Sequence, residues 1–114
     1  MGSLNFPKEK VLETFMDDEE LFEESIAMFL TNVQERLATL KTAVASSDAA
    51  VVMAEAHTIK GMMGYFSDGP PYEAAKKLEF MGREKKLDGA PDALADLEDK
   101  LGQLNQVLQA WIAH

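Results

Sequence analysis

The sequence contains no cysteine, which excludes disulfide bonds, thiolate metal ligands and a cysteine nucleophile. Basic residues are scarce: 11 lysines and arginines stand against 20 aspartates and glutamates, so the formal net charge is −9. Nucleic acids and anionic membranes both bind basic surfaces, and this balance argues against either as a partner. No apolar run approaches the ~20 residues that a membrane-spanning helix needs, and no signal-peptide pattern opens the chain. We therefore expect a domain of the reducing cytoplasm.

What the chain does contain is typical of one folded domain. Its 114 residues are enough for a hydrophobic core but too few for two domains. Apolar residues make up 46% and charged residues 27%, a balance found in globular rather than disordered proteins. We expect a tail at residues 1–6 and a single domain over residues 7–114.

The hydrophobic pattern indicates helices throughout, because no stretch alternates with the two-residue period of a strand. Turn residues and capping residues set the expected boundaries. A short helix is predicted from about Pro7 to Met16, followed by a long helix that Asp17–Glu20 caps and that ends near Ser46-Ser47. Asp48 caps the third helix, which runs to Phe66 and is followed by a break at Ser67–Pro71. The fourth helix ends around Leu87–Gly89, and Pro91 opens the last one.

Each of the four longer segments carries one apolar stripe with three- and four-residue spacing. The stripe residues are Phe22, Ile26, Phe29, Val33, Leu37, Leu40 and Val44; Val52, Ala56, Ile59, Met63 and Phe66; Ala75, Leu78 and Met81; and Leu94, Leu97, Leu101, Leu104, Leu108 and Trp111. Short connections favour antiparallel neighbours. The expected fold is therefore all-α: an antiparallel up-down four-helix bundle with a short additional N-terminal helix.

The third of these segments has an unusual second face. His57, Lys60, Gly61 and Gly64 follow helical spacing on the side opposite the apolar stripe. Glycine inside a helix costs roughly 1 kcal/mol relative to alanine, so two of them beside one imidazole call for a reason. The simplest reason is access, because something large can then approach the imidazole closely.

The run His57-Thr58-Ile59-Lys60-Gly61, with Gly64 following, resembles the signature of histidine-containing phosphotransfer (HPt) domains of bacterial phosphorelays. The long helix before it, the Leu78-Glu79 and Gly82-Arg83 region after it and the leucine-rich last helix are also similar to that family. The resemblance covers roughly residues 7 to 112. The chain departs from the common pattern at Ser67, where many members have glycine, and in a longer, stiffer connection at Gly69-Pro70-Pro71.

The resemblance implies a phosphocarrier without ATP-binding or kinase activity of its own. His57 would accept a phosphoryl group from the phosphoaspartate of a response-regulator receiver domain and pass it to another receiver's aspartate. Lys60 would stabilise charge on the phosphoryl oxygens, Gly61 and Gly64 would leave room for the receiver, and Met53 and Met62 are candidate receiver contacts.

The implied partners are receiver domains and a hybrid sensor histidine kinase, in the same chain or in trans. No cofactor is expected, because the Mg²⁺ that phosphoryl transfer requires would belong to the receiver. One exposed nucleophile on a complete bundle also favours a monomer.

Three other functions, and another role for the two glycines, compete with this interpretation. A metal-binding bundle needs repeated Glu-x-x-His pairs, but Glu55 lies two residues before His57 and no second pair exists, so no metal site is predicted. An interaction bundle with an incidental His57 leaves the two glycines unexplained. Gly61 and Gly64 could instead allow close packing of helices. A domain phosphorylated directly by an ATP-dependent kinase catalytic domain would use the same histidine, and the sequence does not separate it from a relay intermediate.

Overall fold

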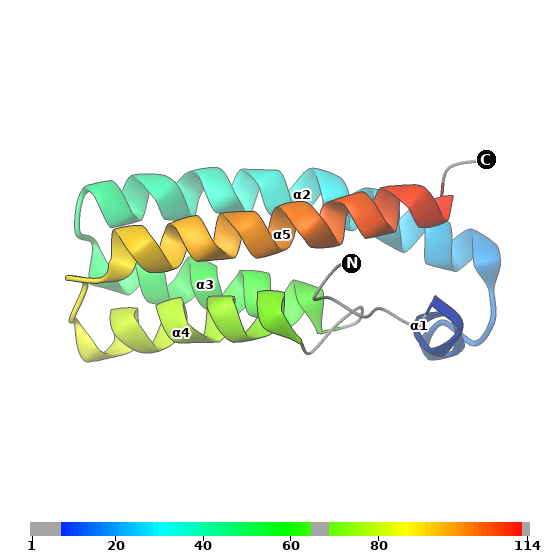
Figure 1. Ribbon diagram of the computed structural model, residues 1–114, viewed down its shortest axis with the longest axis horizontal. Coiled ribbons are helices and arrows are strands. Elements are labelled where there is room, and N and C mark those ends of the chain that lie inside the picture. Colours follow the sequence, from blue (N-terminus) through cyan, green and yellow to red (C-terminus); the bar gives the residue numbers. More distant parts are fainter. Residues whose placement is uncertain (1–7, 65–68, 113–114) are drawn as a thin grey trace.

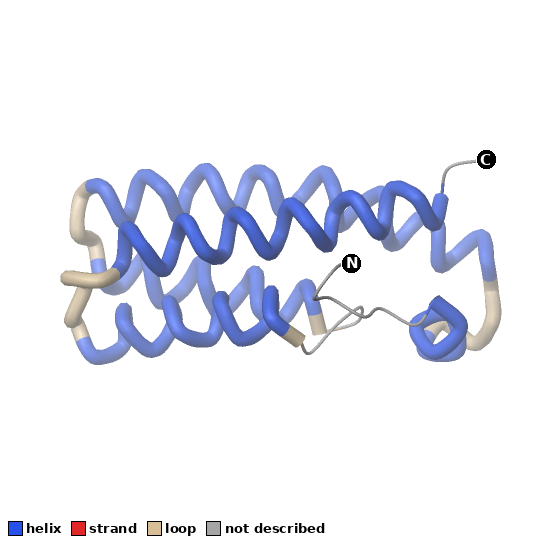
Figure 2. The backbone as a smooth tube through the Cα atoms, viewed as in Figure 1, coloured by secondary structure: helices blue, strands red, loops and turns tan. Residues whose placement is uncertain are grey.

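The computed structural model describes residues 8–64 and 69–112, and over those residues it contains helices and no strand (Figure 2). The helices are α1 (Lys8–Thr14), α2 (Glu19–Ala45), α3 (Ala49–Met63), α4 (Pro70–Glu84) and α5 (Ala90–Ile112). The four long helices lie side by side and alternate in direction (Figure 1). The predicted four-helix bundle with a short additional N-terminal helix is confirmed. Within the described residues, no helix combines the length and apolar character that crossing a bilayer requires.

The core forms where the apolar stripes of the four long helices meet. α3 packs against α2 and α4, and α5 packs against the same two helices, so the four form a closed ring. The predicted stripe residues that are buried come from all four helices: Phe22, Ile26, Phe29, Val33, Leu40, Val44, Val52, Ala56, Ile59, Met63, Ala75, Leu78, Leu94, Leu97, Leu101, Leu104 and Leu108. Leu37, Met81 and Trp111 are partly buried against this core.

The four helices differ in length, and α1 compensates for the difference. α2 has 27 residues and α5 has 23, whereas α3 and α4 have 15 each. α1 lies at the end of the bundle where the two long helices extend beyond the two short ones (Figure 1). There the ring of Phe15 meets Phe22 edge-on at 5.9 Å, and Phe22 stacks on Trp111 at 5.9 Å. Val11 of α1 is buried in the core as well, so α1 and the Phe15 that follows it cover apolar surface that α3 and α4 do not reach.

Two aspartates begin the helices that precede and carry the candidate site. The Asp18 carboxylate accepts a hydrogen bond from the Leu21 N–H at 3.1 Å, and the Asp48 carboxylate accepts one from the Val51 N–H at 3.2 Å. Each satisfies a backbone donor that the first turn of a helix leaves free. Both predicted caps are confirmed.

Three predicted boundaries were wrong. α1 ends at Thr14 rather than near Met16, because Met16 and Asp17 adopt the left-handed region with φ of 57° and 58°. α4 ends at Glu84 rather than around Leu87–Gly89, because Lys85 has φ of 59° and its N–H turns back to the Gly82 carbonyl. Pro70 and Pro71, predicted as a connection, form the first turn of α4, where the missing N–H leaves no helical hydrogen bond unmade.

Some predictions fall on parts of the chain that the structure does not describe. α3 is described as far as Met63, with Gly64 as its C-cap, so its predicted continuation to Phe66 lies outside the described residues. The departure noted at Ser67, the tail at residues 1–6 and the start at Pro7 lie outside them as well.

Candidate functional site

His57 lies on the outer side of α3, as its position off the apolar stripe predicts. Its side chain is 67% exposed, whereas Ala56 and Ile59, on the inner side of the same helix, are fully buried. The Asp48 cap and the burial of this inner stripe fix the rotation of α3 about its axis. They therefore decide that the imidazole points out of the bundle.

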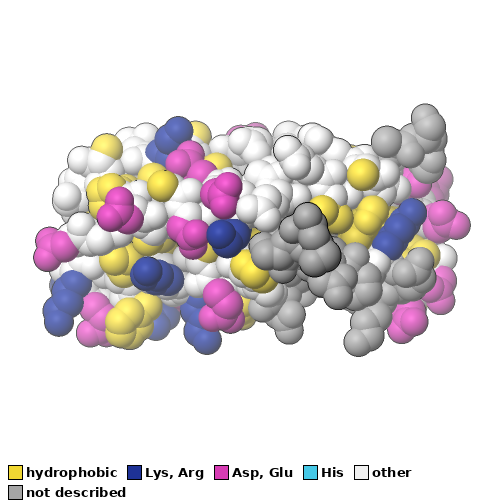
Figure 3. Space-filling model, viewed as in Figure 1, with side chains coloured by type: hydrophobic (Ala, Val, Ile, Leu, Met, Phe, Trp, Pro, Cys, Tyr) yellow, Lys and Arg dark blue, Asp and Glu magenta, His cyan; other side chains and the backbone are white. Residues whose placement is uncertain are grey.

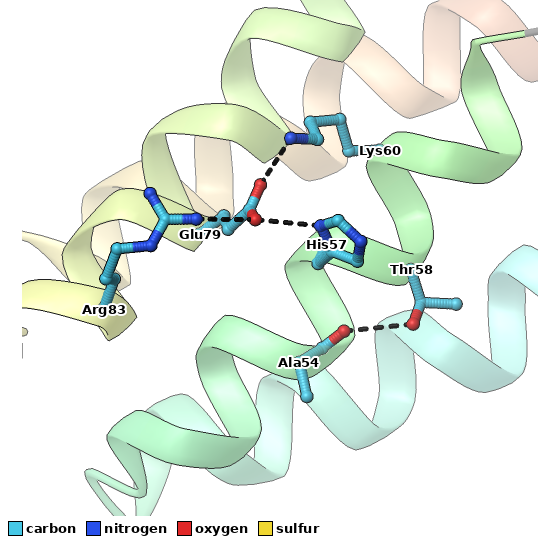
Figure 4. Close-up of polar contacts among 6 residues, drawn as sticks. All are labelled: Ala54, His57, Thr58, Lys60, Glu79 and Arg83. Atoms are coloured by element: carbon cyan, nitrogen blue, oxygen red, sulfur yellow. Dashed lines mark hydrogen bonds and ion pairs between the residues drawn. The ribbon is translucent and has the colours of Figure 1, made fainter.

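The imidazole contacts a buried carboxylate from the neighbouring helix (Figure 4). Nδ1 of His57 lies 2.8 Å from Oε2 of Glu79 on α4. Glu79 is 4% exposed and is the one buried charged residue in the described part of the chain. Nζ of Lys60 lies 2.7 Å from its Oε1, and Nη2 of Arg83 lies 2.9 Å from its Oε2. The Glu79 carboxylate thus contacts the His57 imidazole and the cations of Lys60 and Arg83 at the α3–α4 interface.

This arrangement keeps Glu79 ionised. Burial raises the pKa of its carboxyl, but the hydrogen bonds donated by Lys60 and His57 outweigh that effect and hold the pKa below its ordinary value of 4.5. An ionised carboxylate only accepts hydrogen bonds, so the contact to His57 requires a proton on Nδ1. In the neutral ring Nε2 then carries the lone pair. The geometry therefore presents Nε2 as the nucleophilic atom on an exposed surface.

The hydroxyl next to His57 is occupied elsewhere. Oγ1 of Thr58 donates to the backbone carbonyl of Ala54, one turn earlier in the same helix, at 3.0 Å (Figure 4). Thr58 lies on the side of α3 away from Glu79 in this view. No carboxylate or imidazole in the described residues contacts this hydroxyl as a base, so His57 is the better nucleophile.

Lys60 is close to the imidazole but is held by Glu79. Its side chain is 21% exposed, and its ammonium also lies 5.9 Å from the centre of the Tyr72 ring on α4. The ammonium is therefore fixed beside the site between a carboxylate and an aromatic face. To bind phosphoryl oxygens it must share or exchange its contact with Glu79.

Gly61 and Gly64 both lie in the open, on the same side of α3 as His57. A Cβ added at Gly61 would meet nothing within 4 Å in the described structure, and one at Gly64 would meet only carbonyls of its own helix, at 3.5 and 3.9 Å. The alternative that these glycines allow close helix packing was therefore wrong. Gly82 of α4 has that role, since a Cβ there would lie 2.6 Å from the Met53 backbone nitrogen.

The two candidate methionines lie on different sides of α3. The Met53 backbone is the part of α3 on which α4 rests, opposite Gly82. Met62 is partly buried against the core. Nη1 of Arg36 on α2 lies 3.3 Å from Oε2 of Glu55 on α3, so these two residues stand at the same level of the antiparallel helices.

Counted from the Arg36–Glu55 pair, Met62 stands level with Met28. Met62 lies seven residues after Glu55, and Met28 lies eight residues before Arg36, so both are displaced by about 11–12 Å from the pair at 1.5 Å per residue. Met28 is 64% exposed. Met62 and the exposed Met28 therefore stand at the same level of the bundle, on α3 and α2.

Glu79 and Arg83 were not predicted as site residues, although the resemblance drew attention to the region that contains them. They lie 22 and 26 residues beyond His57, on another helix, so helical spacing within α3 gives no sign of them. A signal does exist in α4, where Ala75, Glu79 and Gly82 follow helical spacing beside the apolar spine. An acidic residue between two small ones at the edge of a buried stripe indicates a carboxylate at a helix–helix contact.

No group of three or more acidic or histidine side chains that could hold a metal ion occurs in residues 8–64 and 69–112. Glu55, considered above as a metal ligand, is instead paired with Arg36.

Comparisons with known proteins identify the family and the fold. The family model "Hpt domain" matches residues 24–109. The histidine-containing phosphotransfer protein B (HptB) of Pseudomonas aeruginosa PAO1 superposes with a TM-score of 0.86 at 19% identity, over 96% of this chain and 95% of that one. The HPT domain of a sensor hybrid histidine kinase from Shewanella superposes with a TM-score of 0.77 at 16% identity, over 91% and 90%. No match was found among curated protein sequences.

Proposed function

The chain belongs to the Hpt domain family of histidine phosphotransfer modules in two-component signalling, and on that premise we propose that it is a phosphorelay intermediate. Nε2 of His57 accepts a phosphoryl group from the phosphoaspartate of one receiver domain and passes it to the aspartate of another. The observation that supports this most is the exposed imidazole whose Nδ1 lies 2.8 Å from the buried Glu79 carboxylate.

The transfer needs few groups from this chain. The Nε2 lone pair attacks phosphorus, the N–P bond forms, and the P–O bond to the donor aspartate breaks, so that a carboxylate leaves. The imidazole ring gains positive charge while Nδ1 keeps its proton. Glu79 stabilises that charge through its contact with Nδ1 and holds the ring in one orientation. Return of the phosphoryl group to an acceptor aspartate reverses these steps.

Lys60 stabilises the charge on the phosphoryl oxygens. The Lys60 ammonium contacts Oε1 of Glu79, and the His57 imidazole contacts Oε2 of the same carboxylate. One carboxylate group therefore separates the ammonium from the imidazole ring that reacts. A cation about 4 Å from a phosphoryl oxygen near a protein surface contributes roughly 1–4 kcal/mol. Lys60 therefore favours the phosphorylated form.

The open surface beside His57 admits the receiver. Gly61 and Gly64 present backbone without side chains, so receiver loops can close over the imidazole without meeting a Cβ. Met62, and the exposed Met28 at the same level of α2, supply apolar contact area on the α2 side. Met53 is the weaker candidate for this contact because its backbone lies under α4.

The test is phosphotransfer from receivers loaded with acetyl phosphate, without ATP or kinase. We expect wild type to acquire acid-labile, base-stable phosphate and His57→Gln to acquire none. His114→Gln, which removes the second of the two histidines in the sequence, serves as the matched control and should label like wild type.

The possible results separate the alternatives. If a kinase catalytic domain with ATP phosphorylates this chain and no receiver does, the domain is a direct kinase substrate rather than a relay intermediate. If neither a kinase nor a receiver phosphorylates it, the interaction bundle is the remaining interpretation. Equal labelling of His57→Gln and wild type would remove His57 from the mechanism.

A further inference from the structure

Basic side chains are unevenly paired over the bundle. Each basic residue of α2, α3 and α5 forms an ion pair: Arg36 with Glu55, Lys41 with Glu98, Lys60 with Glu79, and Lys100 with Asp96 and Asp99. On α4 and just after it, Lys76, Lys77, Lys85 and Lys86 are exposed and have no ion pair among the described residues. A chain with a net charge of −9 thus keeps four unpaired cations on one segment of 11 residues, 76–86.

An exposed aromatic ring lies among these cations. Phe80 is 57% exposed. Lys76, four residues before it, shares the side of α4 that faces away from the buried Leu78, and Lys77, three residues before it, lies at the edge of that side. Figure 3 shows lysine and arginine side chains spread over α4 with hydrophobic and acidic ones between them. Lys76, Lys77 and Phe80 are called the α4 outer face below.

We propose that the α4 outer face docks the receiver domain that exchanges its phosphoryl group with His57, through an apolar pocket bordered by carboxylates on that receiver. Phe80 fills the pocket, and Lys76 and Lys77 pair with the carboxylates. The inference rests on the proposed function and adds to it the chemistry by which a partner is recognised. On a chain with a net charge of −9, a local basic surface such as this one is where carboxylates of a partner are attracted rather than repelled.

The distances allow one partner to cover both sites. Glu79 contacts His57 on one side and Arg83 on the other, and Phe80 is the next residue along α4. A standard interface buries about 800 Å² on each partner, which corresponds to a disc of ~16 Å radius. A helix is about 10 Å wide. A receiver centred on His57 therefore reaches the near part of the α4 outer face, where Lys76 and Phe80 lie about 60° and 100° around the helix from Glu79.

The mixed charge of this face favours a protein over a membrane or a nucleic acid. Glu73 and Glu84 are exposed on α4 and lie seven residues before and four after Phe80, hence on the same side of the helix. A uniformly anionic surface would be repelled by both carboxylates and by the net charge of −9. A folded protein can instead place its own cations opposite them.

The experiment compares phosphotransfer kinetics from a receiver that labels wild type. The test variants are Phe80→Ala and the double charge reversal Lys76→Glu/Lys77→Glu. The matched control is Lys41→Glu/Lys100→Glu, which likewise takes the net charge from −9 to −13 but does so on α2 and α5. Thermal unfolding verifies that every variant is folded, and labelling by phosphoramidate, which requires no docking, measures the reactivity of His57 separately.

We expect each test variant to raise KM for the receiver about tenfold, with kcat and phosphoramidate labelling unchanged, and the control to raise KM much less. Equal KM values for wild type and both test variants, with normal labelling, would overturn the docking assignment while leaving the proposed function intact. Equal increases in the test and control doubles would overturn it too, because net charge alone would then explain the effect.

Two further results have distinct meanings. In the first, wild type binds phosphatidylserine vesicles, Lys76→Glu/Lys77→Glu does not, and KM for the receiver is the same in both. This result would assign the α4 outer face to a membrane and overturn the proposal. Failure of wild type to accept phosphate from phosphoramidate and from every receiver would refute the proposed function, and this inference with it.

Discussion

Replacing Glu79 with alanine tests whether the buried carboxylate prepares His57 for phosphorylation. The substitution removes three contacts of 2.7–2.9 Å, to Lys60, His57 and Arg83. Losing one partner of a fully buried ion pair costs about 3–5 kcal/mol. Here the cations can regain water, since the side chains of Lys60 and Arg83 are 21% and 54% exposed, so we expect about 2 kcal/mol of destabilisation. In a domain of this size that lowers Tm by about 8 °C.

The effect on reactivity is separate from the effect on stability. A hydrogen bond to a charged group contributes about 1.5–3 kcal/mol, which corresponds to about 10- to 150-fold in rate if it acts fully in the transition state. We therefore expect Glu79→Ala to slow phosphoramidate labelling of His57 by at least tenfold at a temperature where the variant is folded. Glu79→Gln, which keeps an acceptor oxygen but not the charge, should lie between wild type and Glu79→Ala.

Labelling rates are measured by quantifying acid-labile phosphate, and folding is verified by circular dichroism at the same temperature. A folded Glu79→Ala that labels at the wild-type rate would refute the positioning role. A lower Tm with an unchanged rate of His57 labelling would show that Glu79 stabilises the fold without affecting the reactivity of His57.

Gly82→Ala should destabilise the bundle by roughly 1–3 kcal/mol in urea unfolding, because its Cβ would lie 2.6 Å from the Met53 backbone nitrogen; an unchanged midpoint would contradict that contact. Lys60→Ala should shorten the lifetime of phosphohistidine or slow its formation without abolishing label, and wild-type values for both would remove its proposed role. Gly64→Phe should slow transfer from a receiver while phosphoramidate labelling and Tm stay nearly unchanged; equal transfer rates would refute the access argument. Acid should weaken the fold through Glu79, whose pKa is lower when folded than its ordinary 4.5. The stabilisation that the ionised Glu79 gives to the fold is complete above pH 4.5 and is lost as the pH falls through the lower pKa of the folded state. The urea midpoint should therefore fall less steeply below pH 4.5 in Glu79→Gln than in wild type. Parallel curves of midpoint against pH would contradict this.

The sequence predicted the fold because each helix carries its own information. Asp18 and Asp48 cap their helices through contacts three residues away, and the apolar stripes need only local spacing. Two of the three boundary errors occurred where the backbone turns through a left-handed residue other than glycine. Lys85 ends α4 in the left-handed region, which glycine ordinarily occupies, so nothing in the sequence marked Glu84 as the last helical residue.

The candidate site could be seen only in part in the sequence, for the same reason. His57, Lys60, Gly61 and Gly64 lie within eight residues of one helix, so their shared face is visible in the sequence. Glu79 reaches His57 only because α4 packs on α3 in one register. Helical spacing alone does not say which flank of α4 faces α3 and which faces α5, so this contact needed the structure.

The contact at Gly82 also bears on which substitutions elsewhere in the protein would disturb the His57–Glu79 contact. One turn of α4 beyond Glu79, backbone rests directly on backbone, with no side chain of adjustable size between the two helices. The spacing between the imidazole and its carboxylate is therefore set by main-chain atoms, which are the same in every sequence. We therefore expect core substitutions distant from Gly82 to leave this spacing unchanged, which makes the α3–α4 pair the unit to transplant when an exposed histidine with a buried carboxylate partner is built into another bundle.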